Sequence, residues 1–362
     1  MQCAWFGYRI AGFAQDRLGN CGFILGLTMP RAIQSKMGEL ELIERIRSGW
    51  GGRQQAARGV ALGIGDDCAI LRVPRGHEVL VTTDFTLEGR HFRRDWHPPE
   101  SVGHRALARG LSDIAAMGGR PLAAFLSLAL PKEMLATRAG RGWVERFFTG
   151  LRGLAERLDV PLAGGDTSES PDGLVLADIV LVGSVPAGRA LRRSGGKVGD
   201  LLYVTGELGG AAAELESLRR GKKRLRGSGG PQLWPEPRVA VGQALVRRRL
   251  ASAAMDLSDG LSTDLAHLCR ESGVGAEIDT AALPVHPLAA GEGALELALH
   301  GGEDYELLFA APAKVRVPRS LAGVRVTRIG RLVRGASISL VGPDGARRPL
   351  KPGGWEHFGE RQ

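Results

Sequence analysis

The hydrophobic and polar residues follow two different periods along the chain, which predicts a fold that mixes helices with strands. Apolar residues that recur every three or four positions predict amphipathic helices, and short runs of β-branched and apolar residues predict strands. We expect helices at residues 39–46, 101–117, 143–158, 211–218, 239–250 and 261–272. We expect strands at residues 77–84, 160–164, 174–182, 201–205, 275–278, 324–329 and 338–341. This alternation indicates the α/β (α+β) class.

The composition divides the chain into three parts. Residues 1–36 contain scattered glycines, aromatics and arginines without a sustained period, whereas Met37 is followed directly by the first amphipathic helix. We therefore predict that residues 1–36 are a disordered leader or a start-site artefact. The glycine- and arginine-rich stretch Pro186–Gly199 is typical of a junction between domains, so the expected domains span residues 37–186 and 187–362.

Charge and cysteine content narrow the possible partners. The formal net charge is +9, but the basic residues gather in two short runs, Arg189–Arg193 and Arg219–Arg226, without interleaved aromatics. Since we also find no nucleic-acid-binding motif, we expect no nucleic-acid partner. The apolar run Cys21–Pro30 is too short to span a membrane. The four cysteines form no C-x-x-C pair, which argues against a disulfide framework or a zinc site and fits a reducing cytoplasm.

Five short motifs place an aspartate beside glycine, serine or threonine at an expected strand end or turn. Hydroxyl groups, bare backbone and carboxylates are the oxygen donors that a hard cation such as Mg²⁺ prefers. Each aspartate alone is better explained as a turn residue or a helix cap, so the argument rests on their recurrence. The motifs are Gly63-Ile64-Gly65-Asp66-Asp67, Thr82-Thr83-Asp84, Leu111-Ser112-Asp113, Gly164-Gly165-Asp166-Thr167 and Asp256-Leu257-Ser258-Asp259-Gly260.

The spacing within these motifs predicts where their side chains point. Thr82 and Asp84 are two residues apart on an expected strand and so face the same side. Asp113 lies at the edge of the apolar arc of its helix, where a carboxylate is partly desolvated and needs a cation or hydrogen-bond donors. Ser258 or Asp259 is expected to cap the helix that follows, which would place free backbone N–H groups beside the site.

Converging aspartates need a counter-charge. Two carboxylates about 4 Å apart repel each other by about 4 kcal/mol at an effective dielectric constant of about 20. The recurrence therefore predicts a site in which metal offsets the repulsion and holds phosphates. Glu88-Gly89-Arg90-His91-Phe92 directly follows the Asp84 strand, so His91 can reach the same cleft, unless it is an ordinary loop histidine. Gly301-Gly302-Glu303-Asp304-Tyr305-Glu306 places acids after paired glycines, or forms a solvated turn.

Taken in order, these motifs resemble those of the thiamine-monophosphate kinases. The ordered set is GIGDD, TTD, EGRHF, LSDIAAMG, GGDT, GRALRRSG, DLSDGL and GGEDYEL, and the resemblance runs from about Met37 to the C-terminus. It implies the two-domain fold of aminoimidazole ribonucleotide synthetase, with mixed or largely antiparallel sheets and an N-terminal domain that forms a homodimer. It also implies direct in-line transfer of the γ-phosphoryl group of ATP to thiamine monophosphate, assisted by several Mg²⁺ ions.

The resemblance assigns roles to single residues. The implied magnesium ligands are Asp67, Thr82, Thr83, Asp84, Asp113, Asp166, Asp256 and, as an outer member, Asp259. The implied ATP contacts are Gly165, Asp166, Arg193 and Ser258. The implied contacts to thiamine monophosphate are His91, Glu303 and a C-terminal aromatic, for which Phe358 is favoured over Trp355. Asp66 is expected to be a structural turn residue.

Two competing interpretations remain open. A selenophosphate or aminoimidazole ribonucleotide synthetase shares the implied fold, but the selenophosphate enzyme needs a reactive cysteine or selenocysteine in a glycine-rich loop. Cys3 and Cys21 lie in no such context. A basic nucleotide- or RNA-binding module without turnover would bind RNA in a salt-dependent manner. The retained carboxylates argue against it, because a binder of polyanions gains nothing from unneutralised acids. The run Arg219–Arg226 belongs to no motif of the resemblance.

Overall fold

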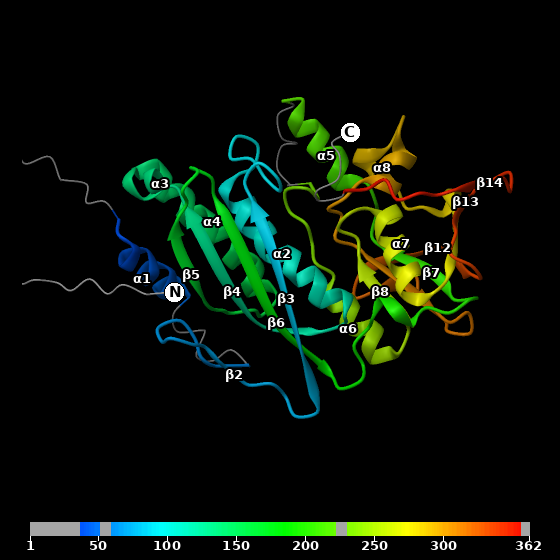
Figure 1. The fold of residues 1–362 in the computed structure, drawn as a ribbon, viewed down its shortest axis with the longest axis horizontal. Helices are drawn as coiled ribbons and strands as arrows, with labels where there is room; N and C mark the ends of the chain where they lie inside the picture. The colour runs from blue at the N-terminus through cyan, green and yellow to red at the C-terminus, as the bar shows by residue number, and fades with distance from the viewer. Residues whose placement is uncertain (1–36, 51–58, 222–229, 356–362) are drawn as a thin grey trace, which may run out of the picture. The chain divides into compact units, whose positions relative to one another are not determined.

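The computed structural model describes residues 37–50, 59–221 and 230–355 (Figure 1). All of these described residues belong to one compact unit by their mutual contacts. The predicted leader, Phe358 and most of the run Arg219–Arg226 lie outside the described residues, and the domain boundary at residue 186 stays a prediction. Within the described part of the chain, no helix is both long and apolar enough to cross a membrane.

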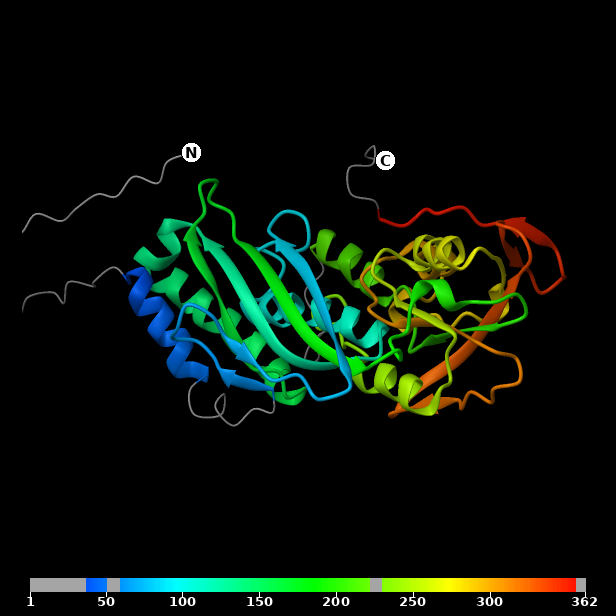
Figure 2. The same ribbon diagram turned by 60° about the horizontal axis from the view of Figure 1, so that its bottom comes forward.

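The first half of the described chain is built on a four-stranded sheet that is covered by helices. The elements are β3 (His77–Leu87), β4 (Arg120–Leu130), β5 (Leu162–Glu169), β6 (Leu176–Pro186), α2 (Pro99–Ala116) and α4 (Arg138–Arg157). The strand order is β3-β6-β4-β5. β6 pairs antiparallel with both β3 and β4, whereas β4 and β5 run parallel, so the sheet is mixed. Figure 2 shows the four strands side by side with α2 and α4 along one face.

Helix α2 is enclosed by other elements on several sides. It packs against β3 and β6, against α4, and against β8 and α6 of the second half. Two glycines permit the close crossing of α2 and α4. A Cβ on Gly103 would lie 1.9 Å from the carbonyl oxygen of Phe147, and one on Gly150 would lie 1.8 Å from that of Glu100. Because α2 is buried along most of its length, its polar side chains must find partners inside the protein.

The second half contains an eight-stranded sheet. Its strands are β7 (Leu201–Thr205), β8 (Ala253–Asp256), β9 (Gly275–Asp279), β10 (Leu307–Ala311), β11 (Ser320–Leu321), β12 (Val324–Val333), β13 (Ile338–Val341) and β14 (Arg347–Pro349). The order is β14-β13-β9-β12-β7-β10-β8, with β11 paired to β12. The pairs are antiparallel except β13 with β9, so the predicted mixed and largely antiparallel sheets are confirmed.

Shorter elements complete the described fold. The remaining helices are α1 (Glu39–Trp50), α3 (Lys132–Ala136), α5 (Gly210–Arg219), α6 (Val239–Arg248), α7 (Leu261–Ser272) and α8 (Ala294–His300). A small antiparallel pair is formed by β1 (Val60–Leu62) and β2 (Ile70–Leu71). The 3-10 turns are η2 (Arg193–Gly195), η3 (Thr280–Ala282) and η4 (Pro287–Ala289).

Three core strands, β4, β8 and β10, were not predicted. β10 is buried at every position, and β4 is buried at most of its positions. A strand that is covered on both faces shows no alternation of polar and apolar residues, so neither periodicity marks it in the sequence. By contrast, the predicted bounds of β7, α7 and β13 agree with the structure residue for residue.

Candidate functional site

Three predicted metal ligands lie where β3, α2 and the end of β8 meet. They are Asp84 on β3, Asp113 on α2 and Asp256 on β8, and we call them the central acidic cluster. The Thr82 hydroxyl donates a 2.5 Å hydrogen bond to Oδ2 of Asp113, which joins β3 to α2. The Ser112 hydroxyl donates a 2.7 Å hydrogen bond to Oδ2 of Asp256, which joins α2 to β8. Thr82 and Asp84 both contact α2, so their predicted placement on one face of β3 is confirmed.

Burial and mutual repulsion weaken the acidity of the central acidic cluster. Desolvation raises the pKa of Asp256 to about 7, and the negative charge of Asp113 adds to the increase. Desolvation also raises the pKa of Asp113, although the hydrogen bond from Thr82 opposes it. At Asp84, desolvation raises the pKa against the opposing charge of Arg109. A nearby cation stabilises ionised carboxylates, so this cluster suits a divalent cation.

Thr83 points away from the central acidic cluster. Its hydroxyl donates a 2.6 Å hydrogen bond to Oδ1 of Asp178 on β6. Val81 and Phe85 share this outer face of the sheet and are 67% and 59% exposed. Because successive side chains of a strand alternate between its faces, the structure does not bring the Thr83 side chain together with Thr82 and Asp84.

A cavity of about 740 Å³ contains two further predicted aspartates, Asp67 and Asp166, together with Gly165. Apolar side chains from α1 and from the sheet, Phe125 among them, line much of its wall. Gly165 has a φ of +150°, and a Cβ there would lie 1.9 Å from the carbonyl oxygen of Leu126, so the position requires glycine. An apolar wall beside carboxylates suits a flat ring with charged substituents.

The acids of this cavity are separate from the central acidic cluster. Asp166 of β5 pairs with Ser127 of β4, which pairs with Asp178 of β6, whereas Asp84 of β3 pairs with Ile179 of β6. Because paired residues share one face of a sheet and successive residues alternate, Asp166 lies on the outer face and does not face the central acidic cluster. Oδ1 of Asp166 accepts a 2.9 Å hydrogen bond from the N–H of its own neighbour in β5. The predicted set of aspartates therefore forms two groups.

Asp66 makes a local turn contact. Its Oδ1 accepts a 2.9 Å hydrogen bond from the N–H of Asp67. Short polar side chains commonly bond to nearby backbone in this way. The contact agrees with the predicted structural role of Asp66.

Glu303 is held by two arginines of α2. Arg105 Nη2 lies 2.5 Å from Oε1 of Glu303, and Arg109 Nη1 lies 3.3 Å from the same oxygen. Gln232 Nε2 donates a 2.9 Å hydrogen bond to Oε2. Although burial alone would raise the pKa of Glu303, the charges of Arg105 and Arg109 hold it below its usual value. Glu303 and Tyr305 have φ angles of +68° and +51°, a strained backbone conformation that gathers at functional sites.

His91 lies beside the same group. Its Nδ1 accepts a 3.0 Å hydrogen bond from the N–H of Leu87, and its carbonyl oxygen accepts one of 3.2 Å from Arg105 Nη2. His91 is close enough to Glu303 to influence its pKa. The structure thus brings together two predicted substrate contacts that lie far apart in the sequence.

Three side chains of this group, Arg105, Arg109 and Gln232, were missed by the sequence analysis. The spacing of the two arginines in the sequence could have identified them. They lie four residues apart on a mostly apolar helix, which places them on the same face. Gln232 belongs to none of the recognised motifs, and only its contact with Glu303 reveals it.

The loop between β8 and α7 differs from the prediction at the start of the helix. The residue before α7 is Gly260, with a φ of +110°, and no side chain caps the helix. The prediction that Ser258 or Asp259 caps α7 is therefore wrong. Asp264, inside the first turn, accepts hydrogen bonds of 3.1 Å from the N–H groups of both Asp259 and Gly260. The backbone donors expected beside the site are thus bound to Asp264.

The C-terminal segment docks on this loop. The N–H of Gly354 donates a 3.1 Å hydrogen bond to Oγ1 of Thr263, and the N–H of Trp355 donates one of 3.0 Å to the carbonyl oxygen of Asp259. A Cβ on Gly354 would lie 2.0 Å from that carbonyl oxygen. Docking therefore places Trp355 next to the predicted outer metal ligand, whereas Phe358 lies outside the described residues.

Arg193 is exposed in η2, close enough to the central acidic cluster to act on it electrostatically. Its positive charge is among the influences that lower the pKa values of Asp113 and Asp256. Its carbonyl oxygen accepts a 2.6 Å hydrogen bond from the Ser272 hydroxyl, which fixes η2 against α7. The guanidinium is therefore placed to meet an anion bound at the cluster.

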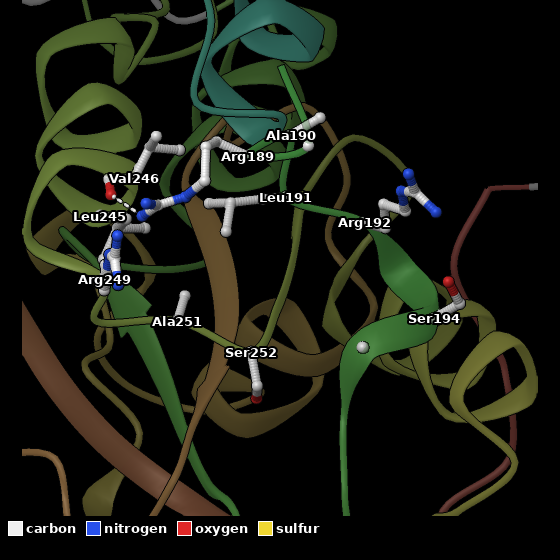
Figure 3. Close-up of a pocket in the computed structure, with 12 residues that line it drawn as sticks. Arg189, Ala190, Leu191, Arg192, Ser194, Leu245, Val246, Arg249, Ala251 and Ser252 are labelled. Carbon is white, nitrogen blue, oxygen red and sulfur yellow. Dashed lines mark hydrogen bonds between the residues drawn. The ribbon is translucent and has the colours of Figure 1, made fainter. Parts of the chain in front are cut away.

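A separate cavity of about 540 Å³ lies beside η2. Figure 3 shows Arg189 and Arg249 near the end of α6, with Arg192 pointing away from them. Arg189 Nη2 donates a 2.8 Å hydrogen bond to the carbonyl oxygen of Val246, a favourable place for a cation at a helix C-terminus. No described aspartate or glutamate lines this cavity, so it is distinct from the carboxylate site.

The donor set suits Mg²⁺ that is bound together with phosphate. No three His, Cys, Asp or Glu side chains of the described residues are arranged to hold a metal ion by themselves. Mg²⁺ commonly takes one or two carboxylates and completes its coordination with water and substrate phosphates. Carboxylate and hydroxyl oxygens at the central acidic cluster fit this requirement. The pKa values of Asp113 and Asp256 are raised, mainly by desolvation, although the charge of Arg193 opposes the increase.

Comparison with known proteins gives a consistent result for both halves. Residues 65–185 match the family described as AIR synthase related protein, N-terminal domain, and residues 197–342 match its C-terminal domain. The thiamine-monophosphate kinase of Escherichia coli (strain K12) is 40% identical over 342 residues, covering 89% of this chain and 98% of that protein. The Bacillus subtilis (strain 168) protein of the same name is 34% identical over 281 residues, or 75% and 82% of the two chains.

Solved structures show the same likeness. The thiamine-monophosphate kinase of Stenotrophomonas maltophilia K279a superposes with a TM-score of 0.73 at 35% identity, covering 86% of this chain and 98% of that one. AaThiL complexed with AMPPCP and TMP gives a TM-score of 0.68 at 32% identity, covering 89% and 97%. These likenesses confirm the predicted α/β fold.

Proposed function

This chain belongs to the thiamine-monophosphate kinases of the AIR synthase related family, and on that premise we propose that it phosphorylates thiamine monophosphate with ATP. The γ-phosphoryl group of ATP passes to the phosphate of the acceptor, giving thiamine diphosphate and ADP. Curated relatives carry the name of this kinase, and a related structure holds AMPPCP and TMP. The reaction is the last step in forming thiamine diphosphate, and we place it in the cytoplasm.

One observation carries the proposal for the chemistry of the site. Three buried or half-buried carboxylates from β3, α2 and β8 act on one another electrostatically, and their pKa values are raised. Such an arrangement is destabilising unless cations are bound. ATP and thiamine monophosphate both carry negatively charged phosphates, which repel each other as they approach. Cations bound at the carboxylates would therefore offset both the repulsion between the carboxylates and the repulsion between the substrates.

The nucleotide is assigned to the cavity beside α1. Its apolar wall suits the adenine ring. Gly165 and Asp166 also line the cavity, and we assign them to the phosphates of the nucleotide. Arg193 and Ser258 would contact the phosphates nearer the central acidic cluster. Because guanidinium groups bind phosphate oxygens through paired N–H groups, Arg193 would add charge neutralisation where the transferred group lies.

The acceptor is assigned to the group around Glu303. His91 and Glu303 lie together there, and the C-terminal segment brings Trp355 to the neighbouring loop. Trp355 is the described candidate for an aromatic that packs on a ring of the substrate, while Phe358 stays a prediction. The acceptor atom is a phosphate oxygen that is already ionised near neutral pH, so the reaction needs no general base.

The magnesium ligands are a proposal on the same grounds. Asp84, Asp113 and Asp256 would hold Mg²⁺ at the central acidic cluster, with Thr82 beside them, while Asp67 and Asp166 would hold it at the nucleotide cavity. Asp259 would be an outer ligand. Bound Mg²⁺ supplies charge neutralisation and alignment of the attacking and leaving oxygens. The chain itself contributes orientation, since Ser112 and Thr82 fix the carboxylates, and direct transfer requires no phosphoenzyme.

A homodimer formed through the first sheet completes the proposal. Val79, Val81 and Phe85 lie on the outer face of the edge strand β3 and are 50%, 67% and 59% exposed. Several exposed apolar side chains on one face of an edge strand can form an interaction site, and a two-fold dimer buries one such face against its own copy.

A coupled assay for ADP formation tests the proposed function. Thiamine monophosphate and free thiamine are compared as acceptors with ATP and Mg²⁺. Turnover is expected with thiamine monophosphate, since the acceptor must carry a phosphate oxygen. Phosphorylation of free thiamine alone would refute the proposal. EDTA is expected to abolish turnover, and added Mg²⁺ is expected to restore it.

A further inference from the structure

Arg109 lies between the two parts of the site. From α2, its guanidinium reaches Asp84 on one side, with Nε 3.1 Å and Nη2 2.7 Å from Oδ1. On the other side, Nη1 lies 3.3 Å from Oε1 of Glu303 and 2.9 Å from the hydroxyl oxygen of Tyr305. The side chain of Arg109 is 12% exposed, so solvent screens these contacts little. One guanidinium is therefore shared by Asp84, a proposed metal ligand, and Glu303, a proposed contact to the acceptor.

The contacts at Asp84 are asymmetric. Both N–H groups of Arg109 that reach Asp84 point to Oδ1, and no described donor is bonded to Oδ2. A partner that holds one oxygen of a carboxylate orients the other toward a metal. Arg109 thus fixes the orientation of the Asp84 carboxylate and leaves Oδ2 of Asp84 for another ligand.

Arg105 provides an internal comparison. It is fully buried and contacts Glu303, but its other partners are the carbonyl oxygens of Gln232 and His91. No contact with Asp84 is present for Arg105 in the described structure. Both arginines hold Glu303 in place, whereas Arg109 alone among the described side chains also reaches Asp84.

We propose that Arg109 is a positioning residue that couples the metal side of the site at Asp84 to the acceptor side at Glu303. This inference rests on the proposed function, since it assigns those two carboxylates to metal and acceptor. A guanidinium shared by two carboxylates binds one more strongly when the other loses its charge. If Asp84 is neutralised, Arg109 pairs more fully with Glu303, and that carboxylate has less charge left for the cationic thiazolium ring of the acceptor.

The coupling is measurable as binding, without turnover. Calorimetric titration of thiamine monophosphate, in EDTA and without nucleotide, gives its dissociation constant for the parent protein, Asp84→Asn, Arg109→Met and the double variant. We expect Asp84→Asn to weaken binding about fivefold in the parent, a size typical of coupled sites. In the Arg109→Met background the same change should have less than about a twofold effect, because the connecting group is gone.

Two further variants keep the test decisive. Arg109→Lys keeps the charge, but its single ammonium group cannot reach both carboxylates, so it should also abolish the coupling even if Arg109→Met folds poorly. Arg120, which is 44% exposed and pairs with Asp159 at the far end of the sheet, supplies the control Arg120→Met. In that background, Asp84→Asn should keep its full effect. Thermal melting verifies that each variant is folded.

The outcomes separate this inference from the proposed function. An equal effect of Asp84→Asn in the parent and in both Arg109 variants would overturn the coupling, as would the absence of any effect in the parent. Either result leaves the kinase reaction intact if the coupled assay shows turnover. If thiamine monophosphate neither binds nor turns over, the proposed function itself fails.

Discussion

The hydroxyl of Ser112 donates a 2.7 Å hydrogen bond to the buried carboxylate of Asp256, although 144 residues separate them in the sequence. The bond ties the buried helix α2 of the first half to the end of β8 in the second. It also opposes the desolvation that raises the pKa of Asp256 to about 7. The Ser112 hydroxyl therefore joins two elements. It also lowers the pKa of Asp256, a proposed metal ligand, and so favours its ionised form.

Replacing Ser112 by alanine should shift the pH dependence of the reaction. The hydrogen bond lowers the pKa of Asp256, so its loss should raise that pKa and move the acidic limb of kcat/KM to higher pH. The shift should be visible at subsaturating Mg²⁺ and shrink at high Mg²⁺, because the metal competes with the proton for the carboxylate.

Ser101→Ala is the matched control for that experiment. Ser101 is also a buried serine of α2, but its hydroxyl bonds to the carbonyl oxygen of Pro98. A superimposable pH profile is expected for this control. If Ser112→Ala also left the profile unchanged, the hydrogen bond to Asp256 would have no bearing on its ionisation during turnover.

Asp84→Asn should lower turnover by at least about tenfold. The substitution keeps the shape of the side chain but removes the charge that a divalent cation needs, and it weakens the pairing with Arg109. Steady-state rates over a range of Mg²⁺ concentrations should show a higher requirement for Mg²⁺. A wild-type rate with an unchanged Mg²⁺ requirement would rule out Asp84 as a metal ligand.

The local motifs of this site were predictable, whereas several of its long-range partners were not. The alternation of side chains on a strand correctly placed Thr82 and Asp84 on one face of β3. The same rule places Thr83 on the opposite face, although the resemblance names all three residues as magnesium ligands. The separation of Asp67 and Asp166 from the central acidic cluster depends on tertiary packing, which local spacing does not encode.

The features that the sequence did not predict have different physical causes. β4 and β10 are covered on both faces, so burial removed the polar alternation that identifies a strand. The start of α7 was assigned to a side-chain cap, but Asp264 inside the helix accepts the N–H groups of Asp259 and Gly260 instead. Arg109 carries no motif, and its role follows from two contacts that lie 25 and 194 residues away along the chain.

The stability of the fold should decrease as the pH rises toward neutrality because of Asp304. Desolvation raises the pKa of its carboxyl group to about 7, although the N–H groups of Gly209 and Ala211 donate to it. A carboxyl with a higher pKa in the folded state stabilises that state when protonated. Its contribution is fully present below about pH 4 and is lost as the pH rises to about 7.

Urea unfolding between pH 5 and pH 8 measures this effect. The slope from Asp304 is at most about 1.4 kcal/mol per pH unit, and Asp304→Asn should flatten the curve because asparagine does not titrate. The parent protein and the variant should therefore differ in slope as well as in absolute stability. Parallel curves for the two proteins would show that Asp304 is ionised in the folded state throughout this range.

Gly354→Ala should weaken the binding of the acceptor. A Cβ at this position would lie 2.0 Å from the carbonyl oxygen of Asp259, so the C-terminal segment would have to move away from the loop after β8. The KM for thiamine monophosphate is expected to rise several-fold, while the KM for ATP stays unchanged, because Trp355 moves with the segment. Gly153→Ala in α4 is the control, since a Cβ there meets nothing within 4 Å. An unchanged KM for thiamine monophosphate would show that the C-terminal segment does not contribute to binding of the acceptor.

Val81→Glu should convert the proposed homodimer into monomers. Val81 is 67% exposed on the outer face of β3, with the exposed apolar residues Val79 and Phe85 on the same face. A charge buried in an apolar interface without a partner is strongly unfavourable, and in a two-fold dimer the substitution enters the interface twice. Sedimentation velocity should show a species of half the mass. Leu40→Glu, at an 82% exposed position of α1, should leave the mass unchanged. A dimer that persists in Val81→Glu would place the interface on another surface.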